Sequence, residues 1–171
     1  PHLLQFNERA RINGLNATDA QLLVHFAEVE AARVSLPDAP TLTYFEFTAL
    51  AIMRFFADAK LDAVILEVGM GGRLDAINIL DADCAIVTSI DIDHAAFLGD
   101  TREKIAREKA GVFRANAIAV CGDPMPPSSL VAHAESLGCD LWLMGRDYNF
   151  QGDKQQWAWS GRGKRFSGLG Y

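Results

Sequence analysis

The stretch from Glu67 to Asp75 constrains the fold of this chain more than any other. It reads Glu-Val-Gly-Met-Gly-Gly-Arg-Leu-Asp and follows an apolar, β-branched run, Ala63–Leu66. Such a run is typical of a strand that is buried on both faces of a parallel sheet. We therefore expect a strand over 63–68 that ends at a carboxylate and enters a glycine-rich turn. Ligands of open α/β sheets bind just outside the carboxyl ends of the strands, so this turn is expected to line a site.

The composition is that of an ordinary globular domain. Of the 171 residues, 50% are hydrophobic and 22% are charged. No apolar run approaches the roughly 20 residues that span a bilayer, and no signal-peptide pattern begins the chain. A net charge of −6 without a basic stripe argues against nucleic-acid binding. We expect a cytoplasmic monomer with no nucleic-acid and no membrane partner.

Strand and helix patterns alternate along the chain, which predicts an α/β fold with a mostly parallel sheet flanked by helices. The expected strands cover 63–68, 84–90, 117–121 and 141–144. The expected helices cover 22–34, 43–59, 101–108 and 127–137. Two further strand patterns, 148–151 and 156–159, flank Gly152-Asp153 and predict a C-terminal antiparallel hairpin at the edge of the sheet.

Two local signals are independent of the sheet. Asn13-Gly14 is a strong signal for a tight turn. Thr43-Tyr44-Phe45-Glu46 fits a capping box, in which the threonine hydroxyl and the glutamate carboxylate each bind a main-chain N–H group at the start of a helix.

Glu67 is the first of three polar residues in unexpected places. At the end of a buried strand, its carboxylate needs a cation, a hydrogen-bond donor or a metal nearby. An ion pair with Arg73 and a metal site are both open alternatives.

His94 is the second, because it follows the predicted strand 84–90 together with Asp91 and Asp93. An imidazole and carboxylates at the end of a neighbouring strand suit a divalent cation. A structural histidine is the alternative.

Lys109 is the third, and it lies at i+4 from Ile105 on the apolar face of the predicted helix. Its side chain either extends past the apolar surface to solvent or is desolvated. A desolvated, neutral amine reacts with carbon dioxide to give a carbamate, which is an anion able to bind a metal.

Five short motifs occur in order. They are Pro1-His2-Leu3 with Asn7-Glu8-Arg9, Thr43-Tyr44-Phe45-Glu46, Leu66 to Ala76, Asp93-His94 with Leu98-Gly99-Asp100-Thr101, and Glu108-Lys109-Ala110-Gly111. Together they resemble the folylpolyglutamate synthase/dihydrofolate synthase family, the folate branch of the Mur-ligase-like, ATP-dependent amide ligases. The resemblance covers nearly the whole chain and implies a P-loop-type central domain of such a ligase.

The resemblance also implies roles for individual residues. Glu67 and His94 would bind Mg²⁺, and Lys109, carbamylated, would be the catalytic residue that helps to hold a second Mg²⁺. The pterin end of dihydropteroate or of folylpolyglutamate would contact Thr43, Tyr44, Phe45, Glu46, Leu74, Asp75 and Ala76. Among these, Asp75 would accept hydrogen bonds from the amino-pyrimidine edge, and Phe45 would form an apolar wall.

The implied reaction uses ATP to phosphorylate a carboxylate, after which the amine of L-glutamate attacks the acyl phosphate and forms an amide. The family's glycine-rich phosphate loop and the serine expected before Pro1 are absent from this sequence, and Ile77 and Ala95 replace threonines. We expect residues 1–171 to form a single partial domain that is inactive alone. A Mur-type cell-wall amino-acid ligase and a non-catalytic relative acting as a binding module are the alternatives.

Overall fold

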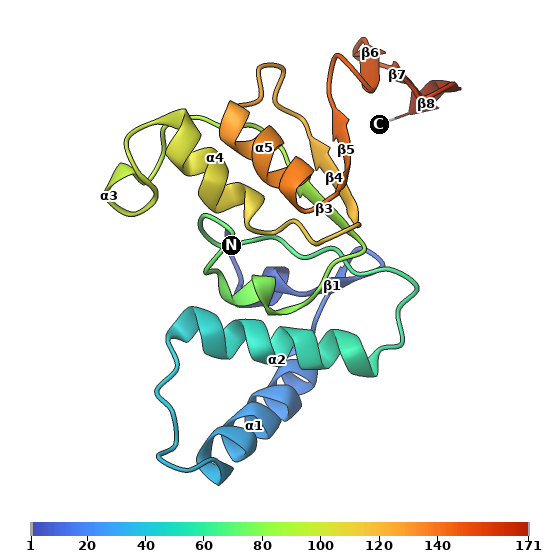
Figure 1. Cartoon of the computed structure of the whole chain (residues 1–171). Helices are drawn as coiled ribbons and strands as arrows, with labels where there is room; N and C mark the ends of the chain where they lie inside the picture. Colours follow the sequence, from blue (N-terminus) through green and yellow to red (C-terminus); the bar gives the residue numbers. More distant parts are fainter. Residues whose placement is uncertain (1, 171) are drawn as a thin grey trace. The chain divides into compact units, whose positions relative to one another are not determined.

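The computed structural model describes residues 2–170 (Figure 1). Pro1, which begins the first motif, and Tyr171 lie outside the described residues. The chain divides into two compact units, Pro1–Gly69 and Met70–Tyr171, and each is described by itself. The single partial domain expected over 1–171 stays a prediction.

The first unit is built on two helices, α1 (Asp19–Ser35) and α2 (Tyr44–Asp58). A short 3-10 helix, η1 (Phe6–Arg9), and a hairpin of β1 (Arg11–Ile12) and β2 (Leu15–Asn16) precede them. Asn13 and Gly14 connect the hairpin with φ angles of 50° and 80°, which confirms the predicted tight turn. Apolar side chains from both helices and from the two residues that flank the hairpin form the core of this unit: Ala10, Ala17, Leu22, Ile52 and Phe55.

Both helices begin with the same capping device. In α2, Thr43 Oγ1 accepts a hydrogen bond from Glu46 N at 3.2 Å, and Glu46 Oε2 accepts one from Thr43 N at 2.7 Å. In α1, Thr18 and Gln21 form the equivalent pair. The predicted capping box at Thr43 is therefore confirmed.

The prediction of a strand over 63–68 is wrong. The segment is assigned to no strand, and the side chains of Val64 and Ile65 are 47% and 94% exposed. An apolar, β-branched run forms a strand only where a neighbour accepts its main-chain hydrogen bonds, and no described strand pairs with this run. Glu67 is accordingly exposed rather than buried at a strand end.

The second unit contains the parallel sheet. Its strands are β3 (Cys84–Val87), β4 (Ile118–Cys121) and β5 (Asp140–Leu143), in the order β3-β4-β5. The crossovers are α4 (Arg102–Ala110) and α5 (Ser128–Ser136), which pack against each other and lie on the same side of the sheet (Figure 1). This arrangement follows from two successive right-handed crossovers, and it confirms the predicted α/β class.

Only one face of this sheet is buried. Ala85, Ala119 and Leu141 lie beneath the helices, whereas Ile86 is 63% and Ile118 is 43% exposed. Burial of the strands on both faces, expected from their continuous apolar runs, is therefore not found.

The C-terminal hairpin forms as predicted but belongs to a sheet of its own. The three antiparallel strands β6 (Tyr148–Gly152), β7 (Gln156–Gly161) and β8 (Lys164–Gly170) make up that sheet. It does not extend the parallel sheet, and β8 has no counterpart in the prediction. No helix within residues 2–170 is both long and apolar enough to cross a bilayer.

Candidate functional site

The glycine-rich turn after Gly69 packs against the end of α4. Arg73 N donates a hydrogen bond to Glu108 O at 2.9 Å. The Arg73 Nε atom lies 3.1 Å from both carboxylate oxygens of Glu108. Arg73 is thus the partner of Glu108, so the expected alternative, an ion pair of Arg73 with Glu67, is replaced by a pair within the second unit.

Close main-chain approach explains two of the glycines. A Cβ atom on Gly72 would lie 2.9 Å from the carbonyl oxygens of Glu108 and Lys109. A Cβ atom on Gly111 would lie 2.6 Å from Arg73 Cα. The turn and the end of α4 therefore interlock at a distance that only glycine permits.

The same turn approaches the helix that follows His94, α3 (Ala95–Leu98). Gly71 has a φ of 72°, and a Cβ atom there would lie 2.9 Å from Leu98 Cδ2. Within the second unit, the turn is thus in contact with the segments that carry His94 and Lys109.

Asp75 organises its own loop and starts a 3-10 helix, η2 (Ala76–Ile79). Its Oδ1 atom accepts a hydrogen bond from Ile77 N at 2.9 Å, and its Oδ2 atom accepts one from Met70 N at 3.0 Å. Because Ile77 contributes its main-chain N–H, the replacement of threonine by isoleucine leaves this turn intact. The neighbouring Leu74 is 81% exposed, and Ala76 is half-buried.

The segment Thr43–Glu46 lies in the first unit. The Glu46 carboxylate serves the cap of α2, and its pKa is lowered by the hydrogen bond from the Thr43 main chain. Tyr44 is 64% exposed and Phe45 is half-buried. Thr43 and Tyr44 line a groove of about 410 Å³ together with Leu42 and Phe47.

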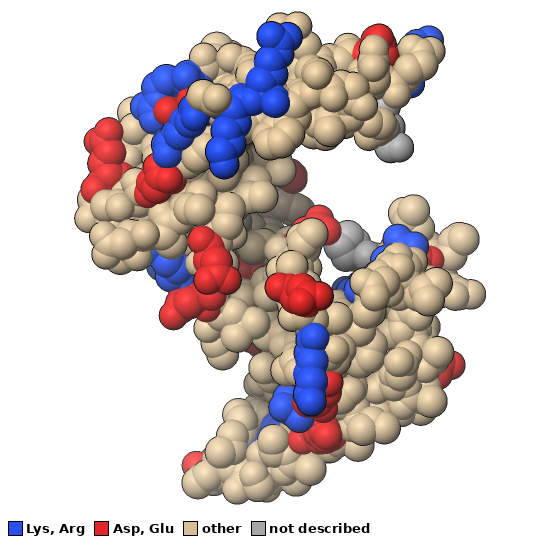
Figure 2. All heavy atoms as spheres, turned by 90° about the vertical axis from the view of Figure 1, so that its right-hand side faces the viewer, with Lys and Arg blue, Asp and Glu red and all other residues tan. Residues whose placement is uncertain are grey.

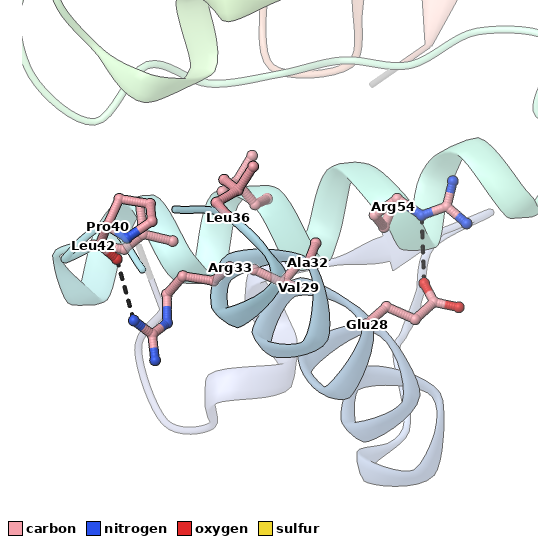
Figure 3. A pocket seen from close by; sticks show the side chains of 9 residues that line it. Glu28, Val29, Ala32, Arg33, Leu36, Pro40, Leu42 and Arg54 are labelled. Carbon is pink, nitrogen blue, oxygen red and sulfur yellow. Dashed lines mark hydrogen bonds and ion pairs between the residues drawn. The ribbon is translucent and has the colours of Figure 1, made fainter. Parts of the chain in front are cut away.

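A second groove, of about 440 Å³, lies between α1 and α2 (Figure 3). Its walls are apolar, and ion pairs and hydrogen bonds hold the charged side chains at its ends. Arg54 Nε lies 3.3 Å from Glu28 Oε2, and Arg33 Nη1 donates to Pro40 O at 3.3 Å. None of the predicted site residues lines this groove.

His94 lies at the start of α3, with its side chain 54% exposed. Its Nε2 atom is 3.6 Å from Asp93 Oδ2. Its φ and ψ of 48° and 42° place it in the left-handed region, which is costly for any residue except glycine. The adjacent imidazole and carboxylate fit a divalent cation such as Mg²⁺ or Mn²⁺.

A buried ion pair that the sequence analysis missed supports the His94 loop. Asp123 has a side chain only 5% exposed, and its Oδ2 atom lies 2.8 Å from Arg102 Nη2. The same oxygen accepts a hydrogen bond from Ile90 N at 2.8 Å, and Arg102 Nε donates to Ile90 O at 2.8 Å. The only signal in the sequence is an acidic residue just after the apolar run 117–121.

Lys109 occupies the last turn of α4 and is half-buried. Within residues 2–170, its amine takes part in no hydrogen bond and no ion pair, in contrast to Lys104, which pairs with Asp100 at 2.8 Å. Among the described residues, no carboxylate therefore pairs with the amine of Lys109.

One group of residues with metal-ligand chemistry lies elsewhere, in the first unit. His25, Glu28 and Asp58 place ligand atoms within 4.8 Å of one another. Arg54 pairs with both carboxylates, at 3.3 Å to Glu28 and 3.1 Å to Asp58. The group is therefore a bridge between α1 and α2 in which an arginine already pairs with both carboxylates.

Comparison with known proteins places the chain in a family. The model of the Mur ligase middle domain matches residues 18–162. The chain belongs to the Mur ligase middle-domain family. The predicted resemblance to the folate branch is confirmed by relatives that carry folate-ligase names.

Three relatives illustrate this. Dihydrofolate synthase/folylpolyglutamate synthase of Haemophilus influenzae is 46% identical over 169 residues, which are 99% of this chain and 38% of that protein. The structure of E. coli FolC in complex with DHPP and ADP has a TM-score of 0.92 at 43% identity, over 100% of this chain and 40% of that chain. The structure of a bifunctional folylpolyglutamate synthase/dihydrofolate synthase with Mn, AMPPNP and L-glutamate bound has a TM-score of 0.89 at 45% identity, over 99% of this chain and 40% of that chain. The Mur ligase middle domain described here thus spans about two fifths of the length of these relatives.

Proposed function

We propose that this Mur ligase middle domain belongs to an ATP-dependent ligase that adds L-glutamate to dihydropteroate and to folylpolyglutamate. The observation that carries the proposal is the match, over almost the whole chain, to relatives named for both activities. ATP would phosphorylate the substrate carboxylate and leave as ADP. The amine of L-glutamate would then attack the acyl phosphate, form the amide and release phosphate.

Within this reaction, Glu67 and His94 would bind Mg²⁺, and carbamylated Lys109 would help to hold a second Mg²⁺. When bound, the metal neutralises charge on the phosphoryl group during transfer. The exposed imidazole of His94 supports its assignment, and that of Lys109 is supported by an amine that pairs with no other group among residues 2–170. The chain's own contribution is to hold these groups on the loop before α3 and on the last turn of α4.

For the pterin ring, the proposed contacts come from two segments. The first is the start of α2, with Thr43, Tyr44, Phe45 and Glu46. The second is the loop around Asp75, with Leu74, Asp75 and Ala76, and the hydrogen bonds that Asp75 accepts from main-chain N–H groups pre-organise it. The groove lined by Thr43 and Tyr44 supports a ligand role for the first.

Calorimetry on the complete ligase tests the substrate class. Dihydropteroate should bind and a UDP-sugar peptide should not, whereas the reverse would favour a cell-wall ligase. A protein that binds neither and ligates no glutamate would be a non-catalytic relative. The isolated 171-residue chain should be inactive, and ligation by it alone would contradict that expectation.

Lys109→Ala in the complete ligase tests the carbamate. The variant should be inactive and should regain part of its activity with small carboxylates such as acetate or formate, because these replace the carbamate oxygens. Lys104→Ala is the control, since that lysine is exposed and pairs with Asp100. Lys109→Ala activity equal to that of the control would overturn the role.

A further inference from the structure

Two of the sequence motifs, the glycine-rich turn and Glu108–Gly111, are in close contact along their main chains. The loop is attached to the end of α4 at both of its ends. At the first end, Arg73 is bound to Glu108 through its main chain and its guanidinium. At the second end, Asn78 Nδ2 donates to Gly111 O at 3.0 Å.

A second arginine secures the far end of the loop. Arg114 Nη2 donates to Asn78 O at 2.7 Å and to Asn78 Oδ1 at 3.0 Å. Arg114 Nη1 donates to Val112 O at 3.2 Å, so one guanidinium joins the loop to the chain just after α4. The loop that carries Leu74 and Asp75 is therefore hydrogen-bonded to Glu108, just before Lys109, and to Gly111, just after it.

The interlock leaves little freedom for independent movement. The main chain of Gly72 is so close to the carbonyl groups of Glu108 and Lys109 that no Cβ atom would fit between them. Groups packed this closely are barely compressible and transmit strain to one another. A ligand that orders the loop must also restrain the turn that presents the amine of Lys109.

We propose that Arg73 is a positioning residue that couples ligand binding at Leu74–Ala76 to metal binding at Lys109. The inference deepens the proposed function and rests on it, because it uses the pterin role of the loop and the metal role of the lysine. Arg73 touches neither the pterin nor the metal in this scheme. It acts through Glu108, the residue that precedes Lys109.

Coupling of this kind is reciprocal and measurable. If the pterin tightens metal binding by some factor, the metal tightens pterin binding by the same factor. The probe is Mn²⁺, followed by electron paramagnetic resonance on the complete ligase with and without saturating dihydropteroate. The wild type should bind Mn²⁺ about tenfold more tightly when dihydropteroate is present, which lies within the usual range for coupled sites.

Arg73→Met removes the guanidinium but keeps the stem and the main-chain bond to Glu108. The tenfold factor should fall to about fivefold or less, because the main-chain bond and the glycine contacts remain, while each ligand alone binds within about threefold of wild type. Arg73→Lys should restore part of the factor, because an ammonium still pairs with Glu108. Arg107→Met is the matched control, an exposed arginine of the same helix, and should retain the full factor.

Each outcome decides the inference. A full factor in Arg73→Met overturns it, and so does a wild type that binds both ligands without coupling, which would leave the proposed function intact. A wild type that binds neither ligand overturns the proposed function and this inference together. If Arg73→Met fails to fold, Glu108→Gln removes the same ion pair from the other side, and an undiminished factor there is equally decisive against the proposal.

Discussion

Arg102 and Asp123 join three segments of the second unit through one ion pair of 2.8 Å. Asp123 follows β4, Arg102 begins α4, and both bind the main chain of Ile90, four residues before His94. Burial would raise the pKa of the Asp123 carboxyl. The hydrogen bonds from Met125, Ile90 and Arg102 outweigh burial and hold that pKa below its ordinary value.

Asp123→Asn should lower the free energy of unfolding at pH 7 by about 2 kcal/mol, because a charged hydrogen-bond acceptor is lost from a buried position. The sign of the pH dependence follows from the lowered pKa. The carboxylate contributes its stability above the unfolded-state pKa of about 3.9, and the contribution is lost as pH falls toward the folded-state pKa. Urea unfolding at several pH values between 3 and 7 measures both effects.

The control is Asp100→Asn, which breaks the exposed pair of Asp100 with Lys104. Exposed pairs contribute little, so its urea midpoint at pH 7 should match that of wild type. If Asp123→Asn were as stable as this control, and its stability fell with pH as that of wild type does, the pair of Arg102 and Asp123 would not support the loop that carries His94.

His94→Gly should stabilise the chain and at the same time weaken Mn²⁺ binding by the complete ligase. A left-handed φ of 48° costs a non-glycine residue about 1 kcal/mol, whereas glycine adopts it freely. The expected gain is about 0.5 kcal/mol, because glycine also loses more entropy on folding. Lys60→Gly is the matched control, with a φ of 50° and an exposed side chain, and should give the same gain with unchanged Mn²⁺ affinity.

For this pair of variants, the combination of results is decisive. Stabilisation without loss of Mn²⁺ affinity would make His94 a strained loop residue and nothing more. A loss of stability in His94→Gly would show that the imidazole is a packing group, against its 54% exposure.

Most of the fold followed from periodicity and capping. The apolar runs located β4 and β5 to within one residue at each end, whereas β3 ends at Val87, three residues before the end of the predicted strand 84–90. The capping box of Thr43 and Glu46 located the start of α2. The run 63–68 was misread because β-branched composition reports that a segment is able to pair, not that a partner exists. The prediction that the strands are buried on both faces failed at Ile86 for the same reason. An apolar run does not show whether another layer of structure covers that face of the sheet.

The site was less predictable from residues alone. Glu67 and Lys109 stand out in the sequence because polar groups interrupt apolar patterns there, and the roles proposed for them come from the family resemblance. Arg73 and Glu108 are 35 residues apart in the sequence, so no local sequence pattern predicts their contact. Asp123 escaped notice because a carboxylate after a strand usually reads as a solvated turn.

Thr43→Ala separates the capping role of this threonine from its proposed ligand role. Losing the cap of α2 should cost about 1 kcal/mol of stability, as for other threonine caps. Thr18→Ala removes the equivalent cap of α1 and should cost the same. If Thr43 also contacts the pterin, only Thr43→Ala should weaken dihydropteroate binding to the complete ligase, by about fivefold or more. Equal affinities in the two variants would leave Thr43 with a capping role alone.

Gly111→Ala tests the interlock between the glycine-rich turn and α4 most directly. The helical φ of −61° suits alanine, so any effect arises from packing and not from backbone strain. The added Cβ would meet Arg73 Cα at 2.6 Å, and relieving that overlap should cost about 2–3 kcal/mol. Gly170→Ala, whose Cβ would meet nothing within 4 Å, should change stability by less than about 0.5 kcal/mol. Urea midpoints that do not differ between the two variants would mean that the turn can move away from α4 at little cost, and the rigid link between the loop and Lys109 would then be lost.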